Sequence, residues 1–312
     1  MRRKNRVTAY LATAGALTLA LMTGVTVAAN IQSNNLDLLL GRGAQHVKDN
    51  SSLDANYIDF KFDNQADALK NAQRMTQLTA EEGMTLLKNE DNALPISKST
   101  GVTVLGYYSW HNNMSGGEDP ATTSGAVSLG KGIKQHFGDK FNQATEDLYS
   151  RVSGDFDNPE VAFAEVEGTF ATHDTAIITL KRNSGEGNDQ SLNMGAKEQN
   201  RSGLVITNAE LKLIDYASKH FSKIIVVINS ANAMELGWLQ DDDPNMHEGI
   251  YTDPYTQKTY DFSKVKAAIW AGCCGSQGGI ALANILTGEV TPSGHLVDTY
   301  VQIGRASCRE RV

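Results

Sequence analysis

The segment Lys223–Asn229, KIIVVIN, is apolar at five consecutive positions, from Ile224 to Ile228. A run that is apolar on both of its alternating sides predicts a β-strand covered on both faces, as in the parallel sheets of α/β proteins. Three similar short runs occur elsewhere, at Val102–Leu105 (VTVL), Thr175–Leu180 (TAIITL) and Ala267–Trp270 (AAIW). We therefore expect these runs to form the sheet at the centre of the fold.

Helical patterns lie between and after these strands. Val127–Phe137 and Thr207–Phe221 have helical spacing, and Thr207 with Glu210 makes the capping-box pattern of a helix start. Gly278–Leu286 is an apolar helix candidate followed by Thr-Gly, which is typical of a helix end. This alternation predicts an α/β fold with a mostly parallel sheet sandwiched by helices.

Three further segments complete the expected organisation. Asp63–Asn89 has apolar residues at helical intervals and predicts a helix before the first strand. Asn183–Asn200 and Gln240–Lys264 lack a clear period and predict long loops, which in compact domains usually serve as lids or binding loops.

The N-terminus predicts export or membrane attachment. Four basic residues before position 7 precede residues 7–29, which are uncharged and largely apolar. This pattern indicates either an uncleaved membrane anchor or a cleaved signal peptide, and both alternatives stay open. We expect the rest of the chain on the extracellular face of the membrane or secreted, with the membrane contacted through residues 7–29.

The C-terminal residues 303–312, IGRASCRERV, follow a well-formed segment without any apolar period. A nucleotide string resembling the adapter of short-read sequencing libraries translates to these ten residues one for one. We therefore interpret them as an artefact and expect the natural gene to continue after Gln302. The expected organisation is a signal segment at 1–29, a linker at 30–60, one α/β domain at 61–302 and the artefact at 303–312.

Charge and cysteine content exclude several functions. The 312 residues carry 28 basic and 36 acidic side chains, a net charge of −8, which disfavours a nucleic-acid binder. Three cysteines cannot form a disulfide framework. Adjacent Cys273 and Cys274 do not have zinc or thioredoxin spacing, and the scattered histidines, His111 and His247 among them, show no metal spacing. Gly275–Gly279 lacks the residues of a P-loop or a dinucleotide site, so no metal or cofactor is expected.

One loop stands out as a candidate catalytic segment. Ligands of open α/β sheets bind at the carboxyl ends of the strands, and Arg182–Asp189 (RNSGEGND) follows such an end. Within it, Glu186 stands between Gly185 and Gly187, an adaptable backbone that can present one carboxyl group to a cleft. Such a carboxyl suits general acid/base catalysis, whereas the alternative is a polar turn with a solvated glutamate.

Four motifs in order resemble the α/β sandwich domain of glycoside hydrolase family 3. They are GMTLLKNEDNALPI (83–96), SGGEDPATTSG (115–125), RNSGEGND (182–189) and GSQGGIALANILTGEVTPSGHLVDTY (275–300). The resemblance covers about residues 60–302. It implies the activity of a retaining, exo-acting β-glycosidase of the β-glucosidase or β-xylosidase class, with Glu186 as general acid/base.

The resemblance also implies a second carboxylate outside this sequence. Retaining hydrolysis uses a nucleophile about 5 Å from the acid/base, and the family carries it on a (β/α)8 barrel beside a tryptophan. No tryptophan here follows an aspartate, and 312 residues do not accommodate a barrel beside the sandwich. We therefore expect a fragment that is inactive alone, whose substrate is a β-linked oligosaccharide or aryl β-glycoside and whose partner is a barrel encoded downstream.

Four further residues are candidates for substrate binding. Arg182 is expected to hold the acid/base carboxyl or a sugar hydroxyl, or else to form a salt bridge on the loop. Asp189 is expected to brace the loop. Tyr108 and Trp110 are expected to form an aromatic wall for a sugar ring, with packing at the edge of the core as the alternative.

Departures from the family pattern keep other functions open. Gln190 stands where the family usually has arginine. Cys273-Cys274 occupies a place where family members often have a Tyr-Pro or Ala-Gly type pair, and Glu118-Asp119 lies in a glycine loop that usually has small residues. The alternatives are a non-catalytic module that binds carbohydrate or a protein partner, and an α/β domain that binds another small ligand.

Overall fold

The computed structural model describes residues 2–32, 62, 64–115, 119–120, 123–184, 189–240, 243–297 and 300. The chain divides into two compact units, Met1–Phe60 and Lys61–Val312. Glu186 with its flanking glycines, Glu118, most of the predicted linker and the predicted artefact at 303–312 lie outside the described residues.

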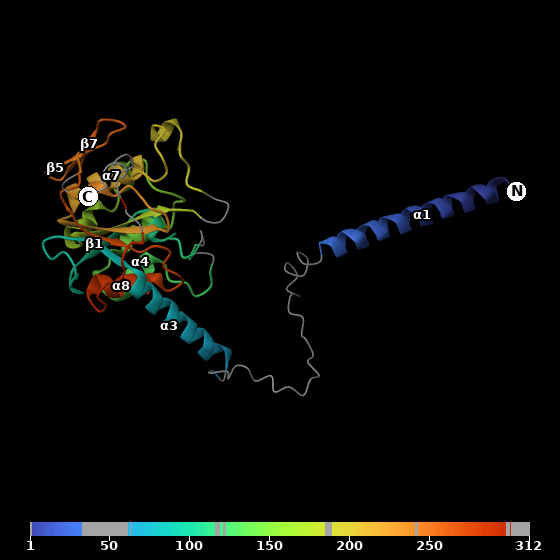
Figure 1. Cartoon of the computed structure of the whole chain (residues 1–312), viewed down its shortest axis with the longest axis horizontal. Helices are drawn as coiled ribbons and strands as arrows, with labels where there is room; N and C mark the ends of the chain where they lie inside the picture. The colour runs from blue at the N-terminus through green and yellow to red at the C-terminus, as the bar shows by residue number, and fades with distance from the viewer. Residues whose placement is uncertain are drawn as a thin grey trace, which may run out of the picture. The chain divides into compact units, whose positions relative to one another are not determined.

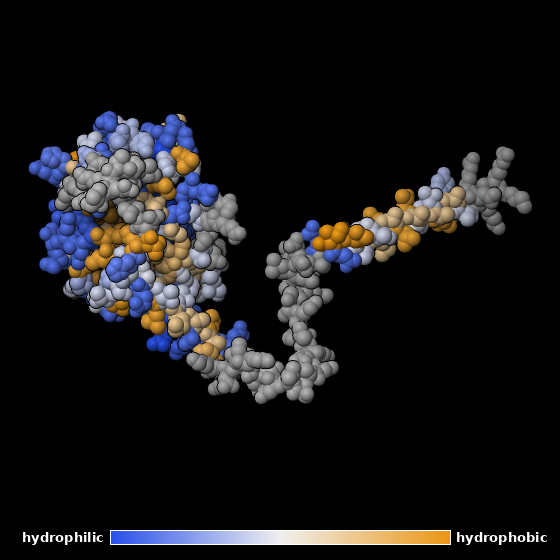
Figure 2. Space-filling view, in the orientation of Figure 1, coloured by the Kyte–Doolittle hydropathy of each residue, from blue (hydrophilic) through white to orange (hydrophobic). Residues whose placement is uncertain are grey.

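The first unit contains a single described helix, α1 (Arg2–Ile31). Its segment Thr8–Ile31 is long and apolar enough to cross a membrane. Apolar residues run along the helix in Figure 2. A signal sequence near an N-terminus has the same length and composition, so the two predicted alternatives both remain.

The centre of the second unit is a five-stranded sheet in the order β1-β8-β4-β3-β2. The four predicted strands are all present, as β2 (Val102–Leu105), β3 (Thr175–Arg182), β4 (Lys223–Ser230) and β8 (Val265–Trp270). These four pair in parallel, whereas the outer strand β1 is antiparallel to β8. The predicted mostly parallel sheet is therefore confirmed.

The prediction of one helix over Asp63–Asn89 is wrong at its C-terminal end. Helix α3 (Gln65–Gly83) stops at the glycine, and Thr85–Asn89 forms the edge strand β1. Leucine and lysine have good helix propensities, but pairing with β8 places this segment in the sheet. Tertiary pairing thus overrides the local pattern.

Helices cover both faces of the sheet (Figure 1). Helix α7 (Asn208–His220) packs on one face, with both hydrogen bonds of the predicted Thr207–Glu210 capping box formed. Helices α4 (Leu129–Phe137) and α8 (Gly278–Thr287) pack on the other, and Gly288 ends α8 with a left-handed φ of 76°. Short helices α5 (Gln143–Tyr149) and α6 (Pro159–Ala162) lie between β2 and β3 in the chain. The predicted sandwich of helices around the sheet is confirmed.

The expected long loop at Gln240–Lys264 contains a small antiparallel sheet instead. Its strands are β5 (Met246–His247), β6 (Ile250–Thr252) and β7 (Thr259–Asp261). Tyr251 and Tyr260 are paired across β6 and β7, and both belong to the core under α7. These buried aromatic residues hold the segment against the domain. The sequence did not predict the small sheet, because its strands are only two or three residues long.

A buried ion pair ties this small sheet to the preceding irregular segment. Arg201 and Asp253 are both fully buried, with 3.0 Å between Nη2 and the carboxylate. Arg201 also donates to the Ile206 carbonyl and lies over the ring of Tyr255. The end of the predicted Asn183–Asn200 loop is therefore fixed from within the domain.

Candidate active site

The carboxyl ends of the four parallel strands meet at one edge of the sheet, and two buried asparagines join the segments that follow them. The Asn113 amide Nδ2 donates to the Arg182 carbonyl at 2.7 Å, and the Asn113 backbone N–H donates to Asn229 Oδ1 at 2.6 Å. Asn229 Nδ2 donates in turn to the carbonyls of Asn113 and Gly272. The segments after β2, β3, β4 and β8 are thus held together by amide groups.

Arg182, the last residue of β3, is buried rather than exposed to substrate. Its guanidinium makes a bidentate pair with Glu210, at 2.7 and 2.8 Å. Its other donors reach the carbonyls of Gly203, Lys181 and Val205, so all five N–H groups are used inside the domain. Arg182 thus forms a salt bridge, as in its alternative, but with Glu210 of helix α7 and not within the loop, and no donor is left for a sugar hydroxyl.

The Arg182–Glu210 pair also links the candidate loop to helix α7. The Glu210 carboxylate accepts both the guanidinium and the backbone N–H of Thr207, the helix cap. Burial raises the pKa of Glu210, but the opposing charge and hydrogen bonds of Arg182 outweigh it, so the pKa lies below its usual value. Both groups are therefore charged at neutral pH, and the start of the loop is anchored by charge.

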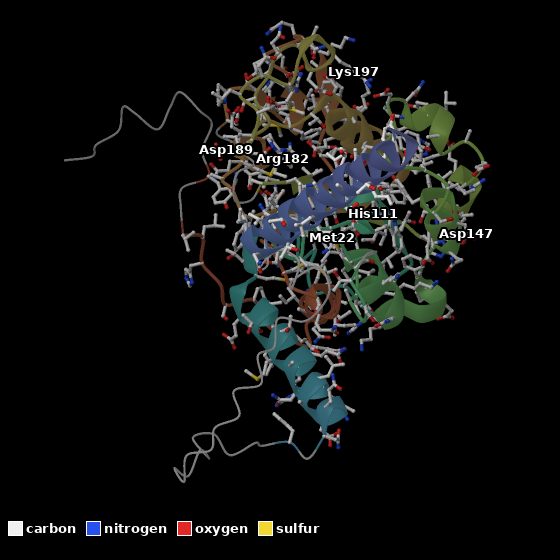
Figure 3. The ribbon with its side chains drawn as sticks, turned by 90° about the vertical axis from the view of Figure 1, so that its right-hand side faces the viewer. Met22, His111, Asp147, Arg182, Asp189 and Lys197 are labelled. Atoms are coloured by element: carbon white, nitrogen blue, oxygen red, sulfur yellow. The ribbon has the colours of Figure 1, made fainter. Side chains whose placement is uncertain are left out.

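Lys181 and His111 lie beside this anchor at the strand ends; His111, Arg182 and Asp189 are labelled in Figure 3. Lys181 donates to the His111 carbonyl at 2.7 Å, and its ammonium is 5.4 Å from the ring centroid of Tyr108. Burial lowers the pKa of Lys181. The His111 ring stacks on Tyr107, and its Nδ1 is 3.1 Å from the Asp119 carboxylate. The two contacts of Lys181 were not expected from the sequence, because they join residues about 70 positions apart in the chain.

The two predicted aromatic residues have different settings. Tyr108 is half-buried beneath Lys181 and lies next to the strand ends. Trp110 packs edge-on against Phe141 and closely over Gly130, where an added Cβ would lie 2.8 Å from the indole ring. Trp110 therefore contributes to core packing, as in its alternative, whereas the role of Tyr108 beside a sugar stays a prediction.

The candidate loop is described at its two ends. Ser184 Oγ donates to Asn232 Oδ1 at 2.7 Å, which joins the start of the loop to the segment after β4. Asp189, at the other end, is exposed. Within the part of the chain that the structure describes, no group of three or more metal-ligating side chains occurs. Cys274 is buried, which raises its pKa to about 12, whereas Cys273 is exposed.

Asp155 is a further residue of this region that sequence reasoning missed. Its carboxylate accepts the backbone N–H of Tyr107 at 3.0 Å, directly after β2. Burial raises the pKa of Asp155 to about 6, although the Tyr107 hydrogen bond opposes the shift. The residue lies in an irregular polar segment, so no pattern in the sequence indicates its burial.

We predict that this carboxyl makes the domain less stable as the pH rises. The folded pKa lies above the unfolded value, so the folded state binds the proton more tightly between about pH 4 and 6. Asp155→Asn keeps an acceptor for Tyr107 without the charge, and it is expected to stabilise the domain by about 1–2 kcal/mol at pH 7.5. Urea denaturation at pH 4.5 and 7.5 measures the difference.

The exposed Asp139 provides the control, since Asp139→Asn removes a carboxyl that is 90% exposed. We expect that substitution to leave the pH trend unchanged. If Asp155→Asn stabilised the domain equally at pH 4.5 and 7.5, the loss of stability at higher pH would not come from the titration of Asp155.

A family model supports the relationship that these features indicate. The glycosyl hydrolase family 3 C-terminal domain matches residues 84–303, most of the chain. The match contains all five strands of the central sheet, together with the candidate loop.

Curated relatives are β-glucosidases. β-Glucosidase A of Butyrivibrio fibrisolvens is 30% identical in an alignment of 259 residues that covers 73% of this chain and 29% of that protein. β-Glucosidase 1 of Saccharomycopsis fibuligera is 27% identical in an alignment of 240 residues that covers 72% of this chain and 24% of that protein. The chain thus spans less than a third of the length of these relatives.

A solved structure supports the fold. β-Glucosidase 3B from Thermotoga neapolitana in complex with glucose superposes with a TM-score of 0.55 at 21% identity, over 72% of this chain and 30% of that one. At this identity the likeness concerns the fold, which the matched sheet and helices share. With a family model matched over residues 84–303, the chain belongs to glycosyl hydrolase family 3, of which it carries the C-terminal α/β sandwich domain.

Proposed function

We propose that this chain supplies the acid/base half of a retaining, exo-acting β-glycosidase that acts on β-linked oligosaccharides or aryl β-glycosides. Glu186 would protonate the leaving oxygen and then deprotonate the attacking water. The observation that carries the proposal is the anchoring of its loop at the carboxyl edge of the sheet, by the Arg182–Glu210 pair and the Asn113 amide.

The other candidate residues have supporting roles in this proposal. Arg182 is a positioning residue that fixes where the loop leaves β3, because its donors are all used within the domain. Tyr108 would border the sugar, and Asp189 would brace the far end of the loop, whereas Trp110 would contribute only to core packing.

The second carboxylate is proposed to come from a (β/α)8 barrel encoded downstream. The relatives are more than three times as long as their matched part, which leaves room for such a domain. Helix α1 would attach the enzyme to a membrane or direct its secretion. Hydrolysis would then take place outside the cytoplasm.

We expect the 312-residue chain alone to release no nitrophenol from aryl β-glucosides, because it lacks the nucleophile. The same chain extended by its downstream coding region is expected to hydrolyse them. Nitrophenol release by both proteins at equal concentration is the measurement.

Two outcomes would contradict the proposal. Turnover by the chain alone would show that the nucleophile lies within it. An extended protein that binds glycosides but does not cleave them would favour the non-catalytic binding module.

A further inference from the structure

Helix α3 places one carboxylate inside the domain. Ala80 and Glu81 are the buried residues of this helix, and Glu81 is only 5% exposed. Its Oε1 accepts from Gln77 Nε2 at 2.8 Å and from Asn284 Nδ2, on helix α8, at 2.5 Å. In Figure 1 the C-terminal end of α3 lies beside α8, whereas its N-terminal part projects from the domain. The contact with Asn284 therefore fixes the end of a helix that is otherwise largely exposed.

The amide of Asn284 connects this carboxylate to a histidine on a third helix. Asn284 is 8% exposed, and its Oδ1 lies 2.7 Å from Nε2 of His136 on helix α4. The other ring nitrogen of His136, Nδ1, lies 3.1 Å from the Gly132 carbonyl of the same helix. A continuous chain of polar contacts thus runs from α3 through α8 to α4.

The contacts of His136 require two protons on its ring. A carbonyl oxygen only accepts hydrogen bonds, so Gly132 requires a proton on Nδ1. Two amide donors converge on Glu81 Oε1, as suits an ionised carboxylate, and the amide of Asn284 then turns its oxygen toward His136 Nε2. A neutral imidazole has one N–H, whereas an imidazolium has two. With Glu81 ionised, all these contacts are therefore made only when His136 is charged.

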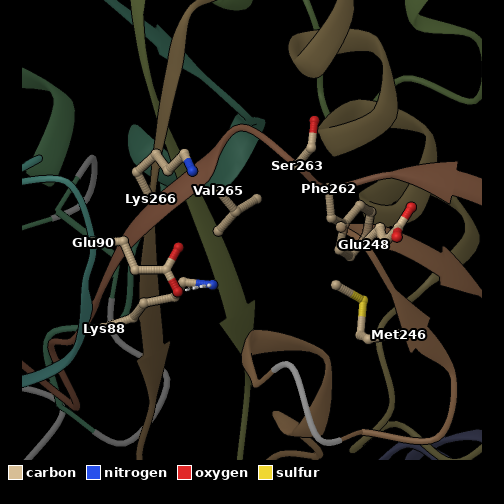
Figure 4. A pocket seen from close by; sticks show the side chains of 9 residues that line it. Lys88, Glu90, Met246, Glu248, Phe262, Ser263, Val265 and Lys266 are labelled. Atoms are coloured by element: carbon tan, nitrogen blue, oxygen red, sulfur yellow. Dashed lines mark ion pairs between the residues drawn. The ribbon is translucent and has the colours of Figure 1, made fainter.

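Glu81 has no direct ion-pair partner in the part of the chain that the structure describes; its two partners are amides. In the hollow of Figure 4, by contrast, Lys88 pairs directly with Glu90, at 3.1 Å. Burying a carboxylate is costly unless hydrogen bonds and an opposite charge compensate it. An imidazolium at His136, one amide away, is placed to supply that charge.

Charged side chains on the neighbouring elements pair with one another rather than with His136. The pairs are Glu289 with Lys98, Glu146 with Lys134, and Asp139 with Lys140. The hydrogen bond from Lys98 is the main cause that lowers the pKa of Glu289, and the charge of His136 adds to it. Glu81 thus differs from these carboxylates, because its compensating charge must come through an amide.

We propose that the proton of His136 is a pH-sensitive latch that holds helix α3 against α8. Loss of that proton leaves one N–H for two acceptors and removes the charge that balances Glu81, so the end of α3 loosens. The contacts need the protonated ring, so their stabilisation is present at mildly acidic pH and is lost as the pH rises. Helix α3 begins the second unit, so the latch sets how firmly the chain that enters this unit is held.

Nuclear magnetic resonance of the full chain in lipid nanodiscs, with isotope-labelled histidine, detects the proton directly. We expect both ring nitrogens of His136 to be protonated at pH 7.5, where an ordinary histidine is largely neutral. His136→Gln identifies its signals, and the exposed ring of His247 gives a comparison in the same spectrum. The competing arrangement has the proton on Glu81 and the Asn284 amide reversed. A ring with a single proton at pH 7.5 would indicate that arrangement and refute the latch.

Amide hydrogen exchange measures whether the latch holds the helix. After correction for the intrinsic exchange rate, protection of the C-terminal half of α3 is expected to fall about tenfold between pH 6 and 9. Helix α7 serves as the reference within the same chain. In Glu81→Gln, a neutral side chain can donate to a reversed Asn284 amide, which then donates to a neutral His136. We therefore expect the fall to be less than twofold in this variant, and an equal fall in variant and wild type would refute the proposal.

Two further variants separate the latch from a general loss of folding. His247→Gln changes an exposed histidine of the small sheet and should keep the tenfold fall. Asn284→Leu removes the connecting amide and should lower the protection of α3 at both pH values, while α7 stays protected. A tenfold fall that persists in Asn284→Leu would overturn the inference. These measurements involve no hydrolysis, so failure of the proposed function would leave them unaffected.

Discussion

Arg182→Met is expected to lower the free energy of unfolding by about 3–5 kcal/mol, because it leaves a charged Glu210 buried without its partner. Arg182 and Glu210 are 6% and 4% exposed, so water cannot replace the lost contacts. Three carbonyls that Arg182 satisfies would also lose their donor. Urea denaturation of the full chain, followed by tryptophan fluorescence, measures the loss.

The loss should shrink as the pH falls. In the wild type, the pKa of Glu210 is lower in the folded state than in the unfolded state. The pair therefore contributes its full stabilisation at pH values above the unfolded pKa. This stabilisation is lost as the pH falls through the folded pKa. In Arg182→Met, burial raises the pKa of Glu210 and only the Thr207 hydrogen bonds still oppose it, so protonation at acidic pH relieves the variant. We therefore expect a smaller difference from wild type at pH 4.5 than at pH 7.5.

An exposed pair in the same domain gives the control. Lys197 and Asp157 are 77% and 71% exposed, at 2.9 Å, and Lys197→Met is expected to destabilise the domain far less than Arg182→Met, because water screens an exposed pair. The double variant Arg182→Met with Glu210→Gln should recover part of the loss, because no buried charge remains. A cost for Arg182→Met as small as that for Lys197→Met would refute the role of the pair.

The parallel sheet could be predicted because each of its strands is a short run of apolar residues that are neighbours in the sequence. Ile224–Ile228 is apolar at every position, and both faces of β4 are in fact covered by helices. The start of α7 could also be predicted, because Thr207 and Glu210 have the capping-box spacing, and both of its hydrogen bonds form. Patterns of this kind depend on residues within a few positions of one another.

The features missed depend on partners distant in the chain. β1 is a strand because it pairs with β8, about 180 residues later. The small sheet β5–β7 is held by buried aromatic residues and by Arg201, about 50 residues from Asp253. No local period encodes such contacts.

The candidate site likewise has features that the sequence predicted and features that only the structure shows. The glycines around Glu186 and its place after a strand were visible in the sequence. The amide contacts of Asn113 and Asn229, 116 residues apart, and the engagement of all donors of Arg182 were not. The sequence therefore indicated a candidate loop, whereas the structure shows what holds its first residue, Arg182, in place.

This anchoring bears on the catalysis proposed for Glu186. A general acid must meet the leaving oxygen within hydrogen-bonding distance, and small displacements cost large factors in rate. The Arg182 side chain and carbonyl are both fixed, so the loop leaves β3 from a defined position. In an enzyme completed by its barrel, Arg182→Lys should therefore lower kcat more than it raises KM.

Glu186→Gln in the extended enzyme is expected to lower kcat/KM by about 10²–10⁴-fold on glycosides with poor leaving groups, because no acid then protonates the departing oxygen. With a dinitrophenyl leaving group, which departs without protonation, the first step should be nearly unaffected. The covalent intermediate would then accumulate, since no base activates water. Nitrophenol bursts and steady-state rates on a series of aryl β-glucosides measure both effects.

Azide separates this role from a structural one. In Glu186→Ala, a small anion can attack the accumulated intermediate without base assistance, so azide should restore turnover and give a β-glycosyl azide of retained configuration. Glu165→Gln, a surface carboxylate that is 53% exposed, serves as the control and should behave like the wild type. Equal losses on all leaving groups, with no azide product, would show that Glu186 does not act as the acid/base.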